Sequence, residues 1–173
     1  MKSLFVTILL VLATASSAFA QTPTFRNQGY KGSVTYTNHC ILFNGFETSH
    51  GYMFNEHHYL GGGVGAFVLV PVDDLPAFLK VYADYHAYIR DKKSTPVVGV
   101  KLGFAHSFVM AHGSDANGMT FINAMNVEPG VAWSWGLKSG YGLKLGLHAD
   151  AYLFDYDKLD IAILPKLSFS FEF

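Results

Sequence analysis

The sequence predicts an all-β protein, an eight-stranded antiparallel up-and-down transmembrane β-barrel preceded by a cleavable signal peptide. Three observations support this fold class. After the first twenty residues, apolar and polar residues alternate with a period of two, and helical spacing is sustained nowhere. Only 14% of the residues are Asp, Glu, Lys or Arg, against about 25% in ordinary soluble domains. The alternating segments are joined by short polar turns, which is typical of an antiparallel meander.

The N-terminus has the pattern of a Sec-type signal peptide over residues 1–20. Lys2 supplies a positive charge, Leu4–Ala13 an apolar stretch, and Ala18-Phe19-Ala20 a small-x-small cleavage site. The apolar stretch is shorter than the roughly 20 residues that a membrane-spanning helix needs. Residues 21–173 are therefore expected to form the mature chain, a single barrel domain.

The first four predicted strands each sort their residues onto two faces. Tyr30–Asn38 alternates Tyr, Gly and Val with Lys, Ser and Thr, and Asn44–Phe54 alternates Phe, Thr, His and Tyr with Gly, Glu and Ser. Tyr59–Val72 sets Leu, Val and Ala against Gly, Tyr and Phe. Leu75–Arg90 is the clearest, because its Ala, Leu, Val and Ile positions alternate with Lys, Asp, His and Arg. An amphipathic helix would not sort its residues with this period.

The last four strands continue the pattern. Pro96–Val109 alternates Val, Leu and Phe with Gly, Lys, Ala and Ser, although His106 falls on the apolar face. Phe121–Leu137 alternates Met, Val and Trp with Asn, Glu, Gly and Ser. Tyr141–Leu153 alternates Leu and Ala with Lys, Gly, His and Asp, and Leu159–Phe173 alternates Leu, Ile and Phe with Asp, Lys, Ser and Glu. Eight such strands close most naturally into a barrel, because closure removes the unpaired strand edges.

Alternation alone does not say which face points inward. A soluble lipocalin-like carrier turns its apolar face in, whereas an outer-membrane barrel turns it out. The polar faces carry few charges among many Gly, Ala, Ser and aromatic residues, which suits a packed lumen better than a wetted exterior. Strands of nine or more residues also match the roughly 9 to 11 residues that cross a bilayer. The apolar face is therefore expected to meet lipid.

Aromatic residues gather at two levels of this predicted barrel. An even number of strands puts both termini on the periplasmic side, and the longest connection, Met110–Gly118, on the extracellular side. The aromatic girdle expected at the periplasmic rim comprises Tyr30, Tyr52, Phe54, Trp133, Trp135, Tyr141, Phe171 and Phe173. The girdle expected at the opposite rim comprises Tyr36, Phe46, Phe108 and Phe121.

The strand count, the alternation, the signal peptide and the final Phe169-x-Phe171-x-Phe173 resemble the small eight-stranded outer-membrane barrels of the OmpX and OmpA-transmembrane-domain type, over residues 25–173. This resemblance implies a monomer in the outer membrane of a diderm bacterium, in contact with outer-membrane lipid and lipopolysaccharide. In that group, an aromatic C-terminus resembles the signal read by the barrel-assembly machinery, so Phe173 implies that partner. The match is one of architecture and says little about activity.

The predicted lumen holds charges of both signs in similar number, and such charges are expected to pair in a low-dielectric interior. The members of this predicted ion-pair network are Glu47, Lys80, Asp84, Arg90, Lys101, Glu128, Lys144, Asp150, Asp160 and Lys166, with Lys31 and Glu172 beside them. We expect them to fill the lumen, because a barrel of eight strands is just wide enough for its side chains. A narrow conducting path is the alternative.

His112-Gly113-Ser114 in the longest loop loosely resembles the His-x-Ser stretch of outer-membrane lipid A deacylases, in which a histidine activates a serine. This pattern suggests a lipid A-modifying hydrolase, in which Glu128 would orient the histidine unless it is buried in the lumen. A turn rich in Gly, Ser, Asp and Asn explains the same residues more simply. We therefore expect no enzyme and no catalytic residue here.

The remaining candidates are weaker. His57 and His58 are adjacent and would point to opposite faces of a strand, so no metal site or cofactor is expected. Cys40 is the only cysteine and cannot form an internal disulfide. A net charge of -1 without a basic stripe argues against nucleic acid. The expected function is a non-catalytic envelope structural or surface-interaction role, with a lipid A hydrolase, a small-solute pore and a soluble carrier as alternatives.

Overall fold

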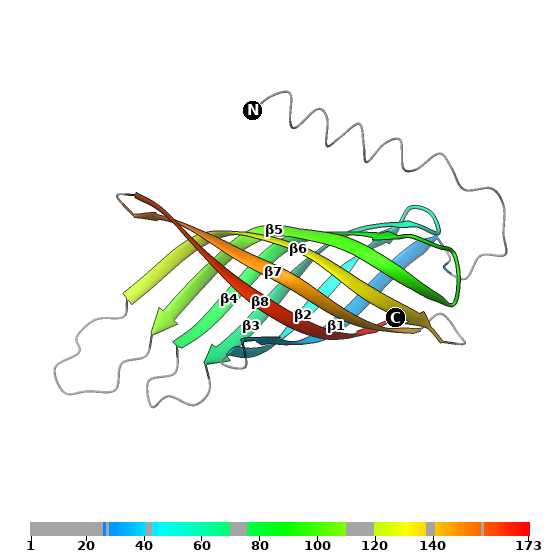
Figure 1. Ribbon diagram of the computed structural model, residues 1–173, viewed down its shortest axis with the longest axis horizontal. Helices are drawn as coiled ribbons and strands as arrows, with labels where there is room; N and C mark the ends of the chain where they lie inside the picture. Colours follow the sequence, from blue (N-terminus) through cyan, green and yellow to red (C-terminus); the bar gives the residue numbers. More distant parts are fainter. Residues whose placement is uncertain are drawn as a thin grey trace, which may run out of the picture.

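The computed structural model describes residues 26, 28–40, 43–69, 76–109, 120–137, 141–156 and 158–173. They form a closed antiparallel barrel in which every strand pairs with its neighbours in chain order (Figure 1). The strands are β1 Gly29–His39, β2 Phe43–Met53, β3 His58–Leu69, β4 Pro76–Tyr88, β5 Ser94–Val109, β6 Thr120–Gly136, β7 Gly142–Tyr156 and β8 Lys158–Glu172. The predicted eight-stranded barrel is confirmed, and the predicted signal peptide lies outside the described residues.

The predicted strand ends lie within three residues of those in the structure, and the differences in β4 and β7 affect the lumen. β4 ends at Tyr88, so Arg90 lies in the following turn. β7 continues past Leu153 to Tyr156, because it pairs with the beginning of β8 as far as Tyr156 and Lys158. We call the end of the barrel where β1 begins and β8 ends the near end, and the opposite end the far end. No helix among the described residues is long and apolar enough to cross a bilayer.

The barrel closes where β8 meets β1. The register runs from Ser33 opposite Glu172 to His39 opposite Lys166, and Gly32 and Phe173 exchange two backbone hydrogen bonds of 2.7 and 2.9 Å. Each residue of a strand lies opposite one residue of the next strand. Followed in this way from Val34 on β1 through β2 to β7, the pairing ends at Ile161 on β8. Across the closing seam, however, Val34 pairs with Phe171, ten residues further on. Because of this offset, the strands are tilted relative to the barrel axis, and they end at different heights at the far end.

The apolar face of the strands points outward and the charged face points into the lumen, as expected for a barrel surrounded by lipid. Outward side chains include Val81, Phe104 and Leu147, each more than 60% exposed. Inward side chains include Glu128 and Asp150, both 0% exposed. A soluble carrier needs the opposite arrangement, so that alternative is not supported. His106 faces outward, as expected from its parity, with Nδ1 2.6 Å from Asn123 Oδ1.

Aromatic residues ring the outer surface at the near end. The exposed members are Tyr30, Tyr52, Phe54, Trp133, Trp135, Tyr141 and Phe171. Trp133 donates a 2.6 Å hydrogen bond from Nε1 to Ser94, and Tyr141 stacks on Phe171 with ring centroids 5.5 Å apart. Half-buried Phe173 ends this ring. Tyr36 and Phe46 are exposed nearer the far end, whereas the side chains of Phe108 and Phe121 lie outside the described part of the structure.

Candidate functional site

The centre of the lumen is organised around Glu128 on β6. Lys80 on β4 lies 2.5 Å from Glu128 Oε2, and Lys166 on β8 lies 2.9 Å from Oε1. His148 Nδ1 on β7 is 3.2 Å from the carboxylate and Lys101 on β5 is 3.5 Å away. Side chains from four other strands therefore meet one fully buried carboxylate, and removing it would leave buried lysines short of a partner.

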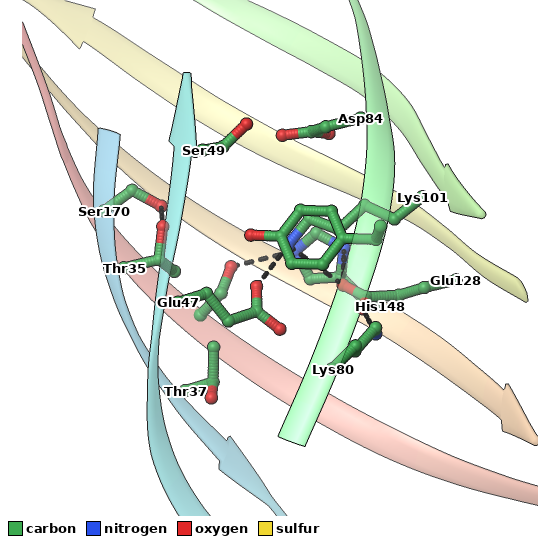
Figure 2. A network of polar contacts seen from close by, with 12 residues as sticks. Thr35, Thr37, Glu47, Ser49, Lys80, Asp84, Lys101, Glu128, His148 and Ser170 are labelled. Atoms are coloured by element: carbon green, nitrogen blue, oxygen red, sulfur yellow. Dashed lines mark hydrogen bonds and ion pairs between the residues drawn. The ribbon is translucent and has the colours of Figure 1, made fainter. Parts of the chain in front are cut away.

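Glu47 on β2 is the second carboxylate of this centre. Lys166 lies 2.5 Å from Glu47 Oε1, and Lys101 pairs with Oε2. Lys101 and Lys166 thus each contact both Glu47 and Glu128. Figure 2 shows Glu47, Lys101, Glu128 and His148 converging in the middle of the barrel. Shared partners of this kind hold Glu47, Lys101, Glu128 and Lys166 in one arrangement, because each of them has at least two ion-pair partners.

Asp150 on β7 gathers a second group on the far-end side of the centre. Its carboxylate lies 2.9 Å from His39 Nε2, accepts a 2.9 Å hydrogen bond from the Tyr152 hydroxyl, and lies 3.3 Å from Lys80 Nζ. Asn126 donates to the same carboxylate from its side-chain amide. Lys80 therefore links this group to Glu128, and all of these side chains are buried.

Glu172 anchors a third group at the near end. The Tyr88 hydroxyl donates a 2.7 Å hydrogen bond to Glu172 Oε1, and the Ser134 hydroxyl donates one of 3.1 Å to Oε2. Lys144 and Lys31 complete the group as ion pairs of 3.3 and 3.4 Å. Met53, Tyr59, Tyr88 and Val97 pack together beside it. The near end of the lumen is therefore closed by both polar and apolar contacts.

Arg26, immediately before β1, belongs to this near-end group and was missed from the sequence. It is 7% exposed, and its guanidinium lies 4.6 Å from the centre of the Tyr88 ring. Nη1 donates a 2.9 Å hydrogen bond to the Lys92 carbonyl and Nη2 one of 3.2 Å to the Ser134 hydroxyl. Arg26 precedes the first alternating segment, so strand periodicity carried no signal for it.

The predicted lumen residues are placed as follows. Eight of them lie buried in the barrel, namely Glu47, Lys80, Asp84, Lys101, Glu128, Lys144, Asp150 and Lys166. All of these except Asp84 form ion pairs between a lysine and a carboxylate, and Asp84 lies 3.0 Å from His86 Nε2. The expectation was wrong for Arg90, which is exposed in the β4–β5 turn because the strand ends two residues earlier. The side chain of Asp160, like His112 and Ser114, lies outside the described residues.

Glycines on the inner face make room for the bulky side chains. A Cβ added to Gly63 would lie 2.6 Å from the Tyr82 ring, and one added to Gly103 would meet the Tyr82 backbone at 2.8 Å. A Cβ on Gly99 would lie 2.5 Å from the His86 ring. Glycine inside a strand marks a close approach of this kind. Each of these glycines therefore leaves space for a large side chain on the neighbouring strand.

One arrangement resembles a nucleophile, a base and an orienting carboxylate. The Ser168 hydroxyl lies 2.8 Å from His148 Nε2, and His148 Nδ1 lies 3.2 Å from Glu128. These distances satisfy the geometry of a triad. However, the cavity beside Ser168 and His148 is about 10 Å³, enough for about one water molecule and too small for an acyl substrate. The two contacts satisfy polar atoms of these side chains inside the barrel.

The lumen as described is filled rather than open. Two small cavities lie in its near half, each of about 10 Å³. The described residues contain no group of three or more metal-ligating side chains placed to hold an ion. A closed barrel with a charged, packed interior and an apolar exterior defines the architecture of the small eight-stranded barrels.

Solved structures share this architecture. The chain is similar to Neisserial surface protein A (NspA), with a TM-score of 0.58 and 11% sequence identity over 83% of this chain and 91% of that one. It is also similar to the N-terminal β-barrel domain of Pseudomonas aeruginosa OprF, with a TM-score of 0.55 and 15% identity over 86% of this chain and 98% of that one. No protein-family model and no curated protein sequence matches the chain. The resemblance to small eight-stranded outer-membrane barrels is thus confirmed in the fold.

Proposed function

We propose that this chain is a non-catalytic integral protein of the outer membrane of a diderm bacterium, with a structural or surface-interaction role in the envelope. The observation that carries the proposal is the orientation of the two faces. Apolar side chains are exposed around the outside, while the charged residues are buried inside. A surface like this is stable only when lipid covers it, and closing the sheet satisfies every strand edge within the bilayer.

The filled lumen supports a structural role over transport. Glu128 and its partners occupy the middle of the barrel, and Arg26 and Tyr88 close the near end. We expect planar bilayers containing the purified protein to show no discrete conductance steps. Steps that vanish when the protein is heat-denatured would instead favour the small-solute pore.

The partners follow from this location. The apolar belt would contact outer-membrane lipid, and the far end would contact lipopolysaccharide. The signal peptide, residues 1–20, would direct export through the Sec pathway, and Phe173 would serve the barrel-assembly machinery. Phe173 already completes the barrel through its two backbone hydrogen bonds to Gly32. We expect one copy to be a complete barrel, because β1 and β8 pair within one chain.

Membrane fractionation combined with gel migration tests the proposal. The protein should be found in the outer-membrane fraction and should migrate differently before and after boiling in SDS, because a closed barrel resists the detergent until it is heated. A variant with β8 truncated before Lys166 cannot close onto β1 and serves as the control that should show no shift. Recovery of the full chain in the soluble periplasmic fraction without detergent would contradict the proposal.

A further inference from the structure

The side chains of His39 on β1, His86 on β4 and His148 on β7 point into the lumen, where each is at most 10% exposed. All three lie within contact distance of a carboxylate. A neutral imidazole can accept a proton at one ring nitrogen and release one from the other. A histidine held between two polar groups can therefore pass a proton from one to the other without moving through the lumen.

His86 joins the near-end group to the middle of the barrel. Its Nδ1 lies 3.3 Å from Lys144 Nζ, and its Nε2 lies 3.0 Å from Asp84 Oδ1. Lys144 pairs in turn with Glu172 at 3.3 Å, and Glu172 lies 3.4 Å from Lys31. The Lys31 side chain is 15% exposed, so this end of the row is open to water. Polar contacts therefore run without a break from Lys31 to Asp84.

A cavity with room for about one water molecule comes next in this row. Its volume is about 10 Å³, and we call it the middle cavity. Asp84 and His86 line one side of it, and Lys101, His148 and Ser168 line the other. Asp84 Oδ1 is buried and forms no aligned hydrogen bond with any described group, so it can accept one from water. A water molecule in the middle cavity would therefore connect Asp84 with the Ser168 hydroxyl.

His148 continues the row on the other side of the middle cavity. The Ser168 hydroxyl lies 2.8 Å from His148 Nε2, and His148 Nδ1 lies 3.2 Å from Glu128. Lys80 then bridges two carboxylates, because its Nζ lies 2.5 Å from Glu128 and 3.3 Å from Asp150. Figure 2 shows Lys80, Glu128 and His148 gathered in the middle of the barrel. The row therefore extends from the middle cavity to Asp150.

His39 ends the row at the far end. Its Nε2 lies 2.9 Å from Asp150, while its Nδ1 has no hydrogen-bond partner among the described residues. The two ends of the row coincide with the two aromatic levels of the outer surface. Glu172 directly precedes Phe173 of the near-end ring, and His39 follows Tyr36 on β1. The row therefore reaches from one side of the expected hydrocarbon layer to the other.

We propose that the row from Glu172 to His39, completed by one water molecule in the middle cavity, is a relay that moves protons through the barrel while the lumen stays closed to other ions and to solutes. This activity goes beyond the proposed structural role, and it rests on the barrel spanning a bilayer. An ion needs an open path as wide as itself. A proton needs only adjacent groups that accept one proton and release another, and rows of Asp, Glu and His inside membrane proteins serve this purpose.

Each step of the relay transfers one proton along one contact and changes no other bond. A proton from water binds Glu172, which transfers it to Lys144 as Lys144 transfers one of its own to His86 Nδ1. His86 releases a proton from Nε2 toward the middle cavity, and the same exchange continues until a proton leaves from His39 Nδ1. One proton enters for each that leaves, so the net charge of the lumen is unchanged. The pH difference across the membrane sets the direction.

Liposomes that contain the purified full chain and an entrapped pH-sensitive dye test the relay. After a pH step outside, with potassium and valinomycin cancelling the electrical potential, the internal pH should relax faster than in protein-free liposomes. The same liposomes should show no added sodium or chloride flux. Relaxation at the protein-free rate would overturn the relay. Sodium or chloride flux beside the proton flux would also overturn it, because it would show an open path.

Two glutamine variants interrupt the relay while keeping a neutral side chain that forms hydrogen bonds. His86→Gln and His148→Gln each replace an imidazole by an amide, which does not accept a proton at one atom and release one from another, so proton flux should fall at least tenfold. His106→Gln, on the outer face, is the matched control and should carry protons as the original chain does. Flux is divided by the folded fraction in unboiled gels, so partial misfolding does not hide the result. Equal flux in all three variants would overturn the relay.

Cell fractionation separates this inference from the proposed function. Protein that fractionates with the outer membrane and inserts into liposomes, yet carries no protons, overturns the relay alone. Protein that carries protons in liposomes but is recovered from cells in the soluble periplasmic fraction overturns the proposed outer-membrane function and leaves the relay standing. Protein that fractionates with the outer membrane and loses its proton flux in His86→Gln and His148→Gln supports both.

Discussion

The hydroxyl of Tyr88 on β4 donates a 2.7 Å hydrogen bond to Glu172 on β8, across the near end of the lumen. The bond joins strands that are not neighbours in the sheet, so it braces the barrel across its interior. Arg26 and Lys31 approach the same ring, 4.6 and 5.1 Å from its centre. Tyr88 therefore combines a buried hydrogen bond to a carboxylate with two cation–π contacts.

Tyr88→Phe keeps the ring and removes only the hydroxyl. We expect it to lower the free energy of unfolding by about 1–3 kcal/mol, because the buried Glu172 loses a donor. Urea unfolding in detergent micelles, followed by tryptophan fluorescence, measures the change. Tyr52→Phe on the exposed outer face is the control and should change little. Equal stability of the two variants would show that the hydroxyl bond adds nothing to the barrel.

Glu128→Gln removes the negative charge around which the central network is built. Lys80, Lys101 and Lys166 are then left with one carboxylate fewer, and we expect a loss of about 3–5 kcal/mol, typical of breaking a buried pair. The measurement is again urea unfolding in micelles.

Adding Lys166→Met to Glu128→Gln should recover part of that loss, since it removes one of the positive charges that have lost Glu128 as a partner. A double-mutant cycle gives the coupling between the two residues. Strictly additive effects would contradict the shared ion-pair network, because independent sites show no coupling.

Gly63→Ala and Gly62→Ala form a matched pair on adjacent residues of β3. The new methyl group at position 63 would point inward and collide with the Tyr82 ring, whereas at position 62 it would point outward, 3.5 Å from the nearest atom. We expect Gly63→Ala to cost about 1–3 kcal/mol through overpacking, and Gly62→Ala to fold normally. The temperature at which the gel shift is lost ranks the two. A lower temperature for Gly62→Ala would mean that the two faces of β3 are assigned the wrong way round.

Much of the fold was predictable from the sequence, because the side-chain period of a strand is two and one face of every strand here is apolar. That period correctly placed Lys80, Glu128 and Lys166 inside the barrel. It failed for Arg90, where the alternation continues in the sequence after the strand has ended. It also carried no information about Arg26, which precedes the first strand.

The pairing of the lumen charges could not be predicted in the same way. Lys166 and Glu47 lie 119 positions apart on strands that are not adjacent, yet they are 2.5 Å apart. Which charges meet depends on the ten-residue offset accumulated around the barrel, and alternation within a strand does not determine that offset. The register also determines that β1 pairs only with Lys166–Glu172 of β8, whereas β7 pairs with β8 from Lys158 onward. The strand boundaries alone do not show this difference.

Arg26→Gln tests whether the residue before β1 closes the near end. The wild-type guanidinium holds the Lys92 carbonyl of the β4–β5 turn and the Ser134 hydroxyl of β6. Without these bonds the turn should open more often, and trypsin should cleave after exposed Lys92 and Lys93 several-fold faster in nanodiscs. Arg26→Lys retains the positive charge but lacks the planar guanidinium with its several N–H donors, so it should give an intermediate cleavage rate. Cleavage at the wild-type rate in Arg26→Gln would mean that Tyr88 and the apolar cluster close the near end without Arg26.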